Sequence, residues 1–246
     1  LKAVTPGNNL CKFADDTYLI VPARNVDSRT AEIENIETWA RTNNLTLNRT
    51  KTKEIVFKDN RRRRQVESPP SILNIDRVTS LKVLGVTITN GLSASDHVRD
   101  VIKSCAQTQY ALRVLRAHGM GNMALQAIFR SVVVAKLLYA SSAWSGFISA
   151  ADRQRVDAYL RRSKSYGYCP LDLPPFEQQC TDVDQKLFDN IQSNNRHLLY
   201  NLLPPPSAAS QNYNLRPRPH NQQLPQHTGY LTDSNFITRM LFKDVY

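Results

Sequence analysis

Two adjacent aspartates, Asp15 and Asp16, stand between short apolar or β-branched runs at residues 10–14 and 17–21. This pattern predicts a tight hairpin with both carboxylates at its tip. Neighbouring carboxylates repel each other, and a divalent cation offsets that repulsion. Because side chains alternate in direction along a strand, the two aspartates need not ligate equally, and Asp15 is the expected direct ligand. The alternative is an ordinary turn, in which aspartate is common.

The elements expected around this pair mix strands and helices, so the predicted fold class is α+β. Pro22 ends the second strand, and apolar residues at helical spacing predict an amphipathic helix from Asp27 or Ser28 to Asn43. Further strands are expected at residues 54–57 and 81–89. Beyond Gly91 the pattern is helical, with helices expected at residues 95–118, 122–138, 152–162, 182–200 and 236–242. The second of these is apolar on more than one side, which is typical of a buried helix in a small bundle.

Basic side chains exceed acidic ones by eleven, and the pI is near 9.7. This balance favours a polyanionic partner such as nucleic acid, because neutralised phosphates release counterions. A basic protein without such a partner is the alternative. No stretch is expected to span a bilayer, and no leader pattern is present, so neither membrane nor secreted proteins are expected. The widely spaced cysteines indicate reduced thiols of an intracellular protein, in the nucleus, the cytoplasm or both, and the spacing of Cys169, Cys180 and His197 is loose for zinc.

Four motifs follow one another along the first ninety residues. They are Phe13-Ala14-Asp15-Asp16-Thr17, a helix with Trp39, Leu47-Asn48-Arg49-Thr50-Lys51-Thr52 before a strand, and Leu81-Lys82-Val83-Leu84-Gly85-Val86. In this order they resemble the later palm of reverse transcriptases from non-LTR (LINE-like) retrotransposons, notably the Jockey-like group. The resemblance continues weakly to the C-terminal region. It implies a right-hand polymerase fold, DNA synthesis that depends on Mg²⁺, and an RNA template/DNA primer duplex and dNTP as substrates.

The resemblance also implies roles for single residues. Asp15 matches the family's metal-binding aspartate in a two-metal site, and Asp16 matches its partner. Lys51 matches a lysine near the phosphates of the incoming nucleotide, where an ammonium could neutralise or protonate the leaving pyrophosphate. A solvated loop lysine is the alternative. Leu84 and Gly85 match the tight turn that grips the primer end, where glycine lets the backbone approach nucleic acid. An ordinary strand glycine is the alternative there.

Three regions are expected: a partial palm of antiparallel sheet and helix at residues 1–90, an all-helical thumb at 91–203, and a loosely ordered tail at 204–246. The family's first palm motif, with a further metal-binding aspartate, would precede residue 1, together with the fingers and the endonuclease. None of Asp27, Asp59 and Asp76 stands in the context needed to replace that aspartate. The isolated chain is therefore expected to supply only part of the Mg²⁺ site and not to polymerise. The alternative function is a non-catalytic, nucleic-acid-binding remnant of a decayed element.

Basic side chains on and after the expected thumb helices could contact the phosphates of a duplex, which are bound without base reading. The candidates are Arg113, Arg116, Arg153, Arg161, Arg162 and Lys164, with Arg155 in the same cluster. Arg61 to Arg64 could also touch nucleic acid or act as a nuclear import signal, although a solvated turn is the expected structure. The aromatic candidates for base stacking, which could equally pack in the core, are Trp144, Tyr159, Tyr166 and Tyr168.

Overall fold

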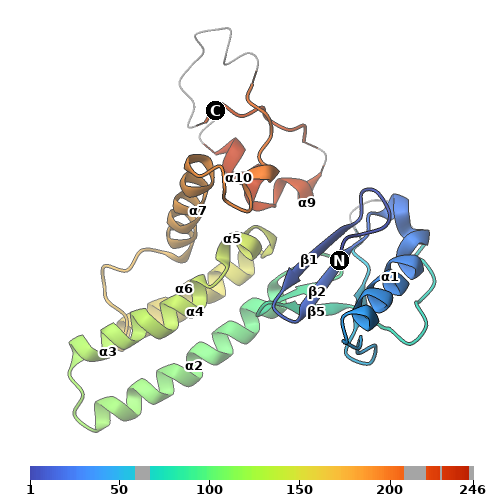
Figure 1. Cartoon of the computed structure of the whole chain (residues 1–246). Helices are drawn as coiled ribbons and strands as arrows, with labels where there is room; N and C mark the ends of the chain where they lie inside the picture. The colour runs from blue at the N-terminus through green and yellow to red at the C-terminus, as the bar shows by residue number, and fades with distance from the viewer. Residues whose placement is uncertain (59–66, 208–219, 228, 244–246) are drawn as a thin grey trace. The chain divides into compact units, whose positions relative to one another are not determined.

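The computed structural model of the chain describes residues 1–58, 67–207, 220–227 and 229–243. The chain forms two compact units, Leu1–Leu81 and Lys82–Tyr246 (Figure 1). Helices and short two-stranded sheets make up both, which confirms the mixed α and β class. The run Arg61 to Arg64 lies outside the described residues.

The first unit opens with the expected hairpin. Strand β1 (Asn9–Phe13) pairs antiparallel with β2 (Asp16–Ile20), and Phe13 faces Asp16 at the end of the ladder. A short 3₁₀ segment, η1 (Ala23–Ser28), leads into helix α1 (Arg29–Thr42), close to the expected bounds. Asn43 caps the end of this helix, and Asn44 takes the left-handed conformation that ends helices (φ 56°). Strand β3 (Lys53–Ile55) pairs in parallel with β4 (Asp76–Val78).

Polar contacts, more than apolar packing, join the parts of the first unit. Ile33, Ala40 and Ile75 are its buried apolar side chains among the described residues. Glu54 on β3 forms ion pairs with Arg29 on α1 (2.6 Å) and with Arg77 on β4 (2.6 Å). These charges are largely shielded from water, so each pair needs its partner in place.

The fully buried Glu32 of α1 binds the N-terminal segment. Its carboxylate accepts hydrogen bonds from the backbone N–H groups of Val4 (3.1 Å) and Thr5 (2.7 Å) and from the side chain of Asn8 (2.9 Å). Burial alone would raise the pKa of this carboxyl, but the hydrogen bonds outweigh it and lower the pKa. The stabilisation is therefore present above the ordinary pKa of glutamate and is lost as the pH falls through the lowered value.

The second unit begins with a second hairpin. Strands β5 (Ser80–Val83) and β6 (Val86–Thr89) are paired and joined by Leu84 and Gly85 alone. The expectation of one strand over residues 81–89 is therefore wrong, because both joining residues have positive φ and reverse the chain. Val86 belongs to the helical core of this unit, which explains why the units divide at Leu81 and not at the expected residue 90.

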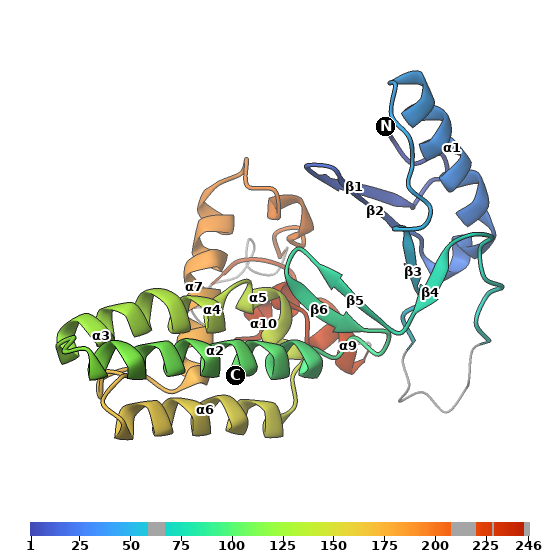
Figure 2. The ribbon, with the colours of Figure 1, turned by 90° about the horizontal axis from the view of Figure 1, so that it is seen from below.

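Helices form the rest of the second unit (Figures 1 and 2). In chain order they are α2 (Ser95–Ala117), α3 (Asn122–Ile128), the π-helical η2 (Phe129–Val134), α4 (Ala135–Leu138), α5 (Ser141–Trp144), the 3₁₀ segment η3 (Ser145–Phe147), α6 (Ala150–Ser165), α7 (Phe176–Ser193), the 3₁₀ segment η4 (Tyr200–Leu202), α9 (Tyr230–Asp233) and α10 (Phe236–Phe242). The helices expected at 95–118, 152–162 and 236–242 are confirmed. Helix α2 lies between α6 on one side and α3–α4 on the other (Figure 2).

The expected helix at 182–200 has different bounds, since α7 begins at Phe176 and ends at Ser193. It begins early because Phe176 packs on Trp144 (ring centroids 6.0 Å apart) and donates its N–H to Asp157 of α6 (3.0 Å). It ends early at a run of serine and asparagine, which favour turns over helix interiors.

The helix from Asn122 buries one stripe only, whereas the sequence predicts burial on several sides. The stripe repeats every four residues, at Leu125, Phe129, Val133 and Leu137. Four residues overshoot one α-helical turn, and the wider π turn of η2 reduces that drift, so the stripe stays on one face. Val132, off the stripe, is exposed.

The stretch Asn122–Phe147 is long and apolar enough to cross a membrane, with a mean hydropathy of 1.5, which corrects the expectation that no stretch meets this test. Its buried stripe belongs to the core of the unit. The helical course is broken at Ala140, which is left-handed (φ 51°), and the stretch carries Arg130 and Lys136. One face of the segment packs in the core, and 22% of its apolar window is buried.

Helices α2 and α6 run side by side and parallel, and one carboxylate joins their first turns. Asp152 is fully buried, and its Oδ2 accepts hydrogen bonds from the hydroxyls of Ser95 (2.6 Å) and Ser149 (2.7 Å) and from the Ser149 N–H (3.1 Å). Further along, the Tyr159 hydroxyl donates to the carbonyl of Cys105 (3.0 Å). Burial alone would raise the pKa of Asp152, but the hydrogen bonds from Ser95 and Ser149 lower it.

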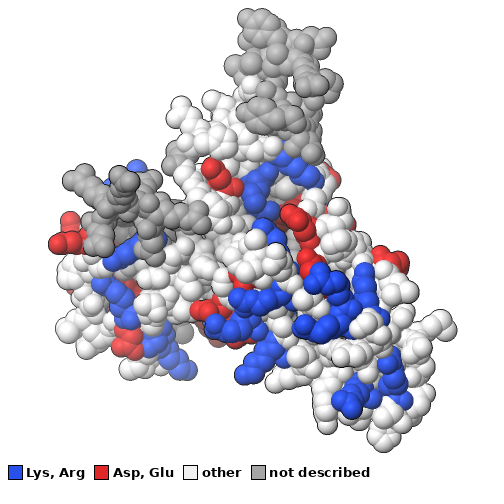
Figure 3. Space-filling view, turned by 180° about the vertical axis from the view of Figure 1, so that it is seen from behind, with Lys and Arg blue, Asp and Glu red and all other residues white. Residues whose placement is uncertain are grey.

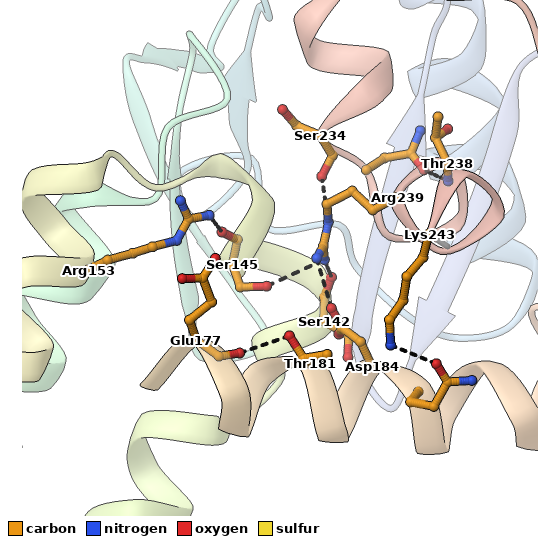
Figure 4. Close-up of polar contacts among 12 residues, drawn as sticks. Ser142, Ser145, Arg153, Glu177, Thr181, Asp184, Ser234, Thr238, Arg239 and Lys243 are labelled. Carbon is orange, nitrogen blue, oxygen red and sulfur yellow. Dashed lines mark hydrogen bonds and ion pairs between the residues drawn. The ribbon is translucent and has the colours of Figure 1, made fainter. Parts of the chain in front are cut away.

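The C-terminal segment, with the expected helix at residues 236–242, packs on α5 and α7 (Figure 4). Arg239 of α10 forms an ion pair with Asp184 of α7 (2.8 Å) and donates to the carbonyl oxygens of Ser142 (3.3 Å) and Ser234 (3.2 Å). Met240 and Leu241 form a small core with Phe188.

Gly146 makes this close approach of the C-terminal segment possible. A Cβ at position 146 would collide with the backbone carbonyl of Ser234, which cannot swing aside as a long side chain can.

Asp152→Ala should destabilise the second unit by about 2–4 kcal/mol, because several hydrogen bonds to a buried charge are lost. Urea unfolding monitored by circular dichroism measures the change. Asp100→Ala is the matched control, since Asp100 is exposed on α2, and about 0.5 kcal/mol or less is expected. Because the pKa of Asp152 is lowered, the difference between Asp152→Ala and the unchanged chain should shrink as the pH falls below about 4. Equal stability of Asp152→Ala and Asp100→Ala would show that Asp152 does not join α2 to α6.

Gly146→Ala should displace the C-terminal segment at a cost of about 1–3 kcal/mol, the range typical of overpacking. Hydrogen exchange at residues 236–242 should become faster. Gly121→Ala is the control, because a Cβ there meets open space. Unchanged exchange in Gly146→Ala would show that the segment does not sit on Gly146.

Candidate functional site

The hairpin of the first unit presents Asp15 and Asp16 to solvent. Asp15 lies in the two-residue turn with Ala14, and Asp16 is the first residue of β2, so the tip lies one residue earlier than expected. Both side chains are exposed, and Asp16 accepts a hydrogen bond from the Tyr18 hydroxyl (3.3 Å). Ala14 has a positive φ (50°), a conformation that costs about 1–2 kcal/mol for a residue with a side chain. Such strain is concentrated at functional sites.

A cation–π contact connects the hairpin to α1. The ammonium of Lys12 on β1 lies 4.0 Å from the ring centroid of Trp39. This contact gives Trp39 a role in positioning the hairpin. Phe13, next to the turn, is largely exposed.

Lys51 lies in the turn that precedes β3. The side chain of Asn48 shapes this turn by accepting hydrogen bonds from the Lys51 N–H (3.2 Å) and the Thr50 hydroxyl (2.7 Å). Lys51 is exposed. Within the described part of the chain, no hydrogen bond or ion pair connects Lys51 to either aspartate, so the structure does not join these three predicted residues into one site.

The carboxylates of Asp15 and Asp16 are suitable ligands for Mg²⁺, but two carboxylates are too few for a two-metal site. Carboxylate oxygens are preferred ligands of Mg²⁺. Across the residues that the structure describes, however, no three His, Cys, Asp or Glu side chains gather into a group that could hold a metal ion. The pair alone is thus an incomplete ligand set for a two-metal site, and no reaction step is derived from it.

The turn at Leu84 and Gly85 lies in the second unit. Both residues have positive φ (46° and 88°), as a type I′ hairpin turn requires. Leu84 is 43% exposed. The Tyr139 hydroxyl donates a hydrogen bond to the Leu84 carbonyl (3.0 Å). The resemblance predicts a tight turn here, and the structure contains one, although the sequence gives no sign of the contact with Tyr139.

The structure divides the predicted phosphate-binding residues into two groups. Three of them bind the protein itself: Arg116 donates to the carbonyl of Tyr166 (2.7 Å), Arg153 to that of Ser145 (3.1 Å), and Lys164 to that of Leu173 (2.6 Å). Arg116 also lies over the ring of Tyr168, 4.0 Å from its centroid. These side chains fix turns and helix ends.

The other three, Arg113, Arg161 and Arg162, are exposed on α2 and α6. Arg155 and Arg162 lie four residues before and three after Tyr159, which faces α2, so both border the seam between the two helices. Arg113 lies one turn before Arg116, on the side of α2 that faces α6. Figure 3 shows Lys and Arg gathered over this part of the unit. We call Arg113, Arg155 and Arg162 the basic seam; Arg155 also forms an ion pair with Asp152 (3.2 Å), and Arg161, two residues after Tyr159, is exposed on another side of α6.

The local charge balance singles out the same helices. Residues 95–165 contain eleven Lys and Arg against four Asp and Glu, and so carry most of the net charge of +11. Tyr110, which the sequence reasoning missed, is 69% exposed on α2, three residues before Arg113. An exposed aromatic beside basic groups is suited to stacking on bases.

Of the aromatic candidates, Trp144, Tyr159 and Tyr168 are buried and pack in the core. Tyr166 is exposed. Burial raises the pKa of the Cys169 thiol and raises that of Cys180 to about 12, so both thiols stay protonated at neutral pH. Neither cysteine belongs to a metal-binding group in the described ranges.

Comparison with known proteins identifies no relative: no protein-family model, no curated protein and no solved structure matches this chain.

Proposed function

We propose that the chain is the later palm and the thumb of an RNA-directed DNA polymerase, the reverse transcriptase of a non-LTR retrotransposon. The observation that carries this proposal is the exposed, strained hairpin tip with Asp15 and Asp16, followed by a helix, as in the motifs that the sequence resembles. In the complete protein, Asp15 and Asp16 would hold Mg²⁺ together with a carboxylate from a preceding segment. When bound there, the metal would supply activation of the primer 3′-hydroxyl and charge stabilisation of the leaving pyrophosphate.

The open surface of the first unit supports the need for that preceding segment. Phe13 and Ile20 of the hairpin are exposed apolar side chains, and β1–β2 is a sheet of only two strands. Isolated two-stranded sheets are marginally stable in water, and further strands with a covered face stabilise them. The missing palm strands would supply both.

The basic seam supports an RNA template/DNA primer duplex as the partner. Its guanidinium groups are exposed along two parallel helices, and Arg155 and Arg162 are about 10 Å apart along α6. Phosphate contacts of this kind fix a duplex without reading its sequence. Lys51, exposed in its turn, is available to the phosphates of dNTP, which it could neutralise.

A second candidate function is a nucleic-acid-binding remnant without catalysis. The observation that favours it is the incomplete set of metal ligands in the described residues, alongside a basic seam that needs no metal.

The catalytic role is tested by primer extension. The isolated chain should not extend a primer, and a longer protein with the in-frame preceding segment should. In the longer protein, Asp15→Asn should lower the rate by more than about 100-fold, since even outer partners of metal ligands matter 10- to 100-fold. Asp27→Asn, an exposed aspartate outside the hairpin, is the matched control. Synthesis by the isolated chain, or full activity of Asp15→Asn, would contradict the proposal.

Duplex binding tests the basic seam and applies to both candidate functions. Arg162→Gln should make the slope of log K against log salt concentration shallower by about 0.9, because one phosphate contact and the counterion it releases are lost. Arg130→Gln removes the same charge from the helix opposite, where Arg130 pairs with Asp172 (3.0 Å), and should leave the slope unchanged. Fluorescence anisotropy over a salt series measures both. If Arg162→Gln has the same slope as the unchanged chain, the basic seam is not the binding surface. If the longer protein binds the duplex but does not extend the primer, the non-catalytic remnant is favoured.

A further inference from the structure

Tyr139 contacts both residues of the turn at Leu84 and Gly85. Its hydroxyl donates to the Leu84 carbonyl (3.0 Å), and a Cβ at Gly85 would lie only 3.2 Å from a carbon of its ring. The space that a side chain at Gly85 would need is therefore occupied by the Tyr139 ring. The glycine serves this contact inside the protein, in addition to its positive φ.

Tyr139 is itself held by the core. It ends α4, and Ala140 after it is left-handed, so the chain turns sharply there. The Tyr139 carbonyl accepts a hydrogen bond from the indole N–H of Trp144 (2.9 Å). Trp144 is fully buried and stacks on Phe176. The backbone of Tyr139 is thus attached to one of the most deeply buried side chains of the unit, while Tyr139 itself is 54% exposed.

The same tryptophan supports the hairpin from a second side. The ring of His97 lies edge-on to Trp144, with centroids 5.0 Å apart. Its Nδ1 accepts the N–H of Thr87 on β6 at 3.5 Å, a long hydrogen bond. The turn and the second strand of β5–β6 are therefore both tied to the Trp144 core, one through Tyr139 and the other through His97.

We propose that Tyr139 is a positioning residue, which fixes the Leu84–Gly85 turn so that its backbone meets the 3′ end of a nucleic-acid strand at a defined place. This inference rests on the proposed function. A two-residue turn of left-handed conformation on a short hairpin would otherwise move with the hairpin, and contact with one strand end requires it to stay within a fraction of an ångström. Backbone N–H groups at such a turn can donate to the last phosphodiester before the 3′-hydroxyl. Tyr139 is not itself required to touch the strand.

The test compares two RNA–DNA hybrids, one with a recessed primer 3′ end and one with blunt ends, for binding to the full chain. The unchanged chain should prefer the recessed end. Tyr139→Phe keeps the ring and removes the hydroxyl, and should reduce that preference about two- to tenfold, the value of one hydrogen bond, with affinity for the blunt hybrid unchanged. Tyr200→Phe, on η4, is the matched control and should change neither.

Hydrogen exchange guards against a general loss of structure. In Tyr139→Phe, exchange at residues 80–89 should become faster, and exchange in α2 and α6 should not change. A preference equal to that of the unchanged chain would overturn the inference and leave the proposed function intact. Equal binding of both hybrids by the unchanged chain would do the same. Failure of the unchanged chain to bind either hybrid would overturn the proposed function, and this inference with it.

Discussion

The hydrogen bonds of Asp152 join the two helices on which the second unit is built. Three donors converge on one oxygen of a fully buried carboxylate, two from the start of α6 and one from the start of α2. A buried charge is stable only with such partners, so this arrangement fixes the relative position of the first turns of both helices. Because the first turns are fixed, Cys105 of α2 lies beside Tyr159 of α6, and Arg116 lies beside Tyr166 at the far ends. The same alignment of the two helices brings the arginines of the basic seam together.

The sequence predicts elements whose signals are local. The hairpin around Asp15 follows from two apolar runs with turn residues between them, and α1 from its spacing and its asparagine end. The division of residues 81–89 into the two strands β5 and β6 is not predicted. The alternating pattern continues through Leu84, and leucine seldom adopts a positive φ. Helix α7 begins at Phe176 because of a contact with Trp144, thirty-two residues earlier in the chain, and no local pattern contains that contact.

The residues of the candidate site also separate into those with a local sequence signal and those whose role depends on contacts distant in the chain. Residue types predict which side chains can bind metal or phosphate, so Asp15, Asp16 and the arginines of α6 are found from sequence alone. Burial and internal bonds are not visible there, and they remove Arg116, Arg153 and Lys164 from the surface set. Tyr139 belongs to a stretch through which the resemblance continues weakly, but nothing in the sequence shows that its side chain contacts Leu84 and Gly85.

The parallel course of α2 and α6 has an electrostatic consequence. Each helix carries a macrodipole, positive at its first turn and negative at its last, and two parallel dipoles side by side repel. Asp152 places a negative charge between the two positive ends, and Arg116, bonded to the last turn of α6, places a positive charge near the negative ends. The pair therefore neutralises its own ends with its own side chains. Between those ends Arg155 pairs with Asp152 (3.2 Å), and the exposed Arg113 and Arg162 remain open to an anion from solvent.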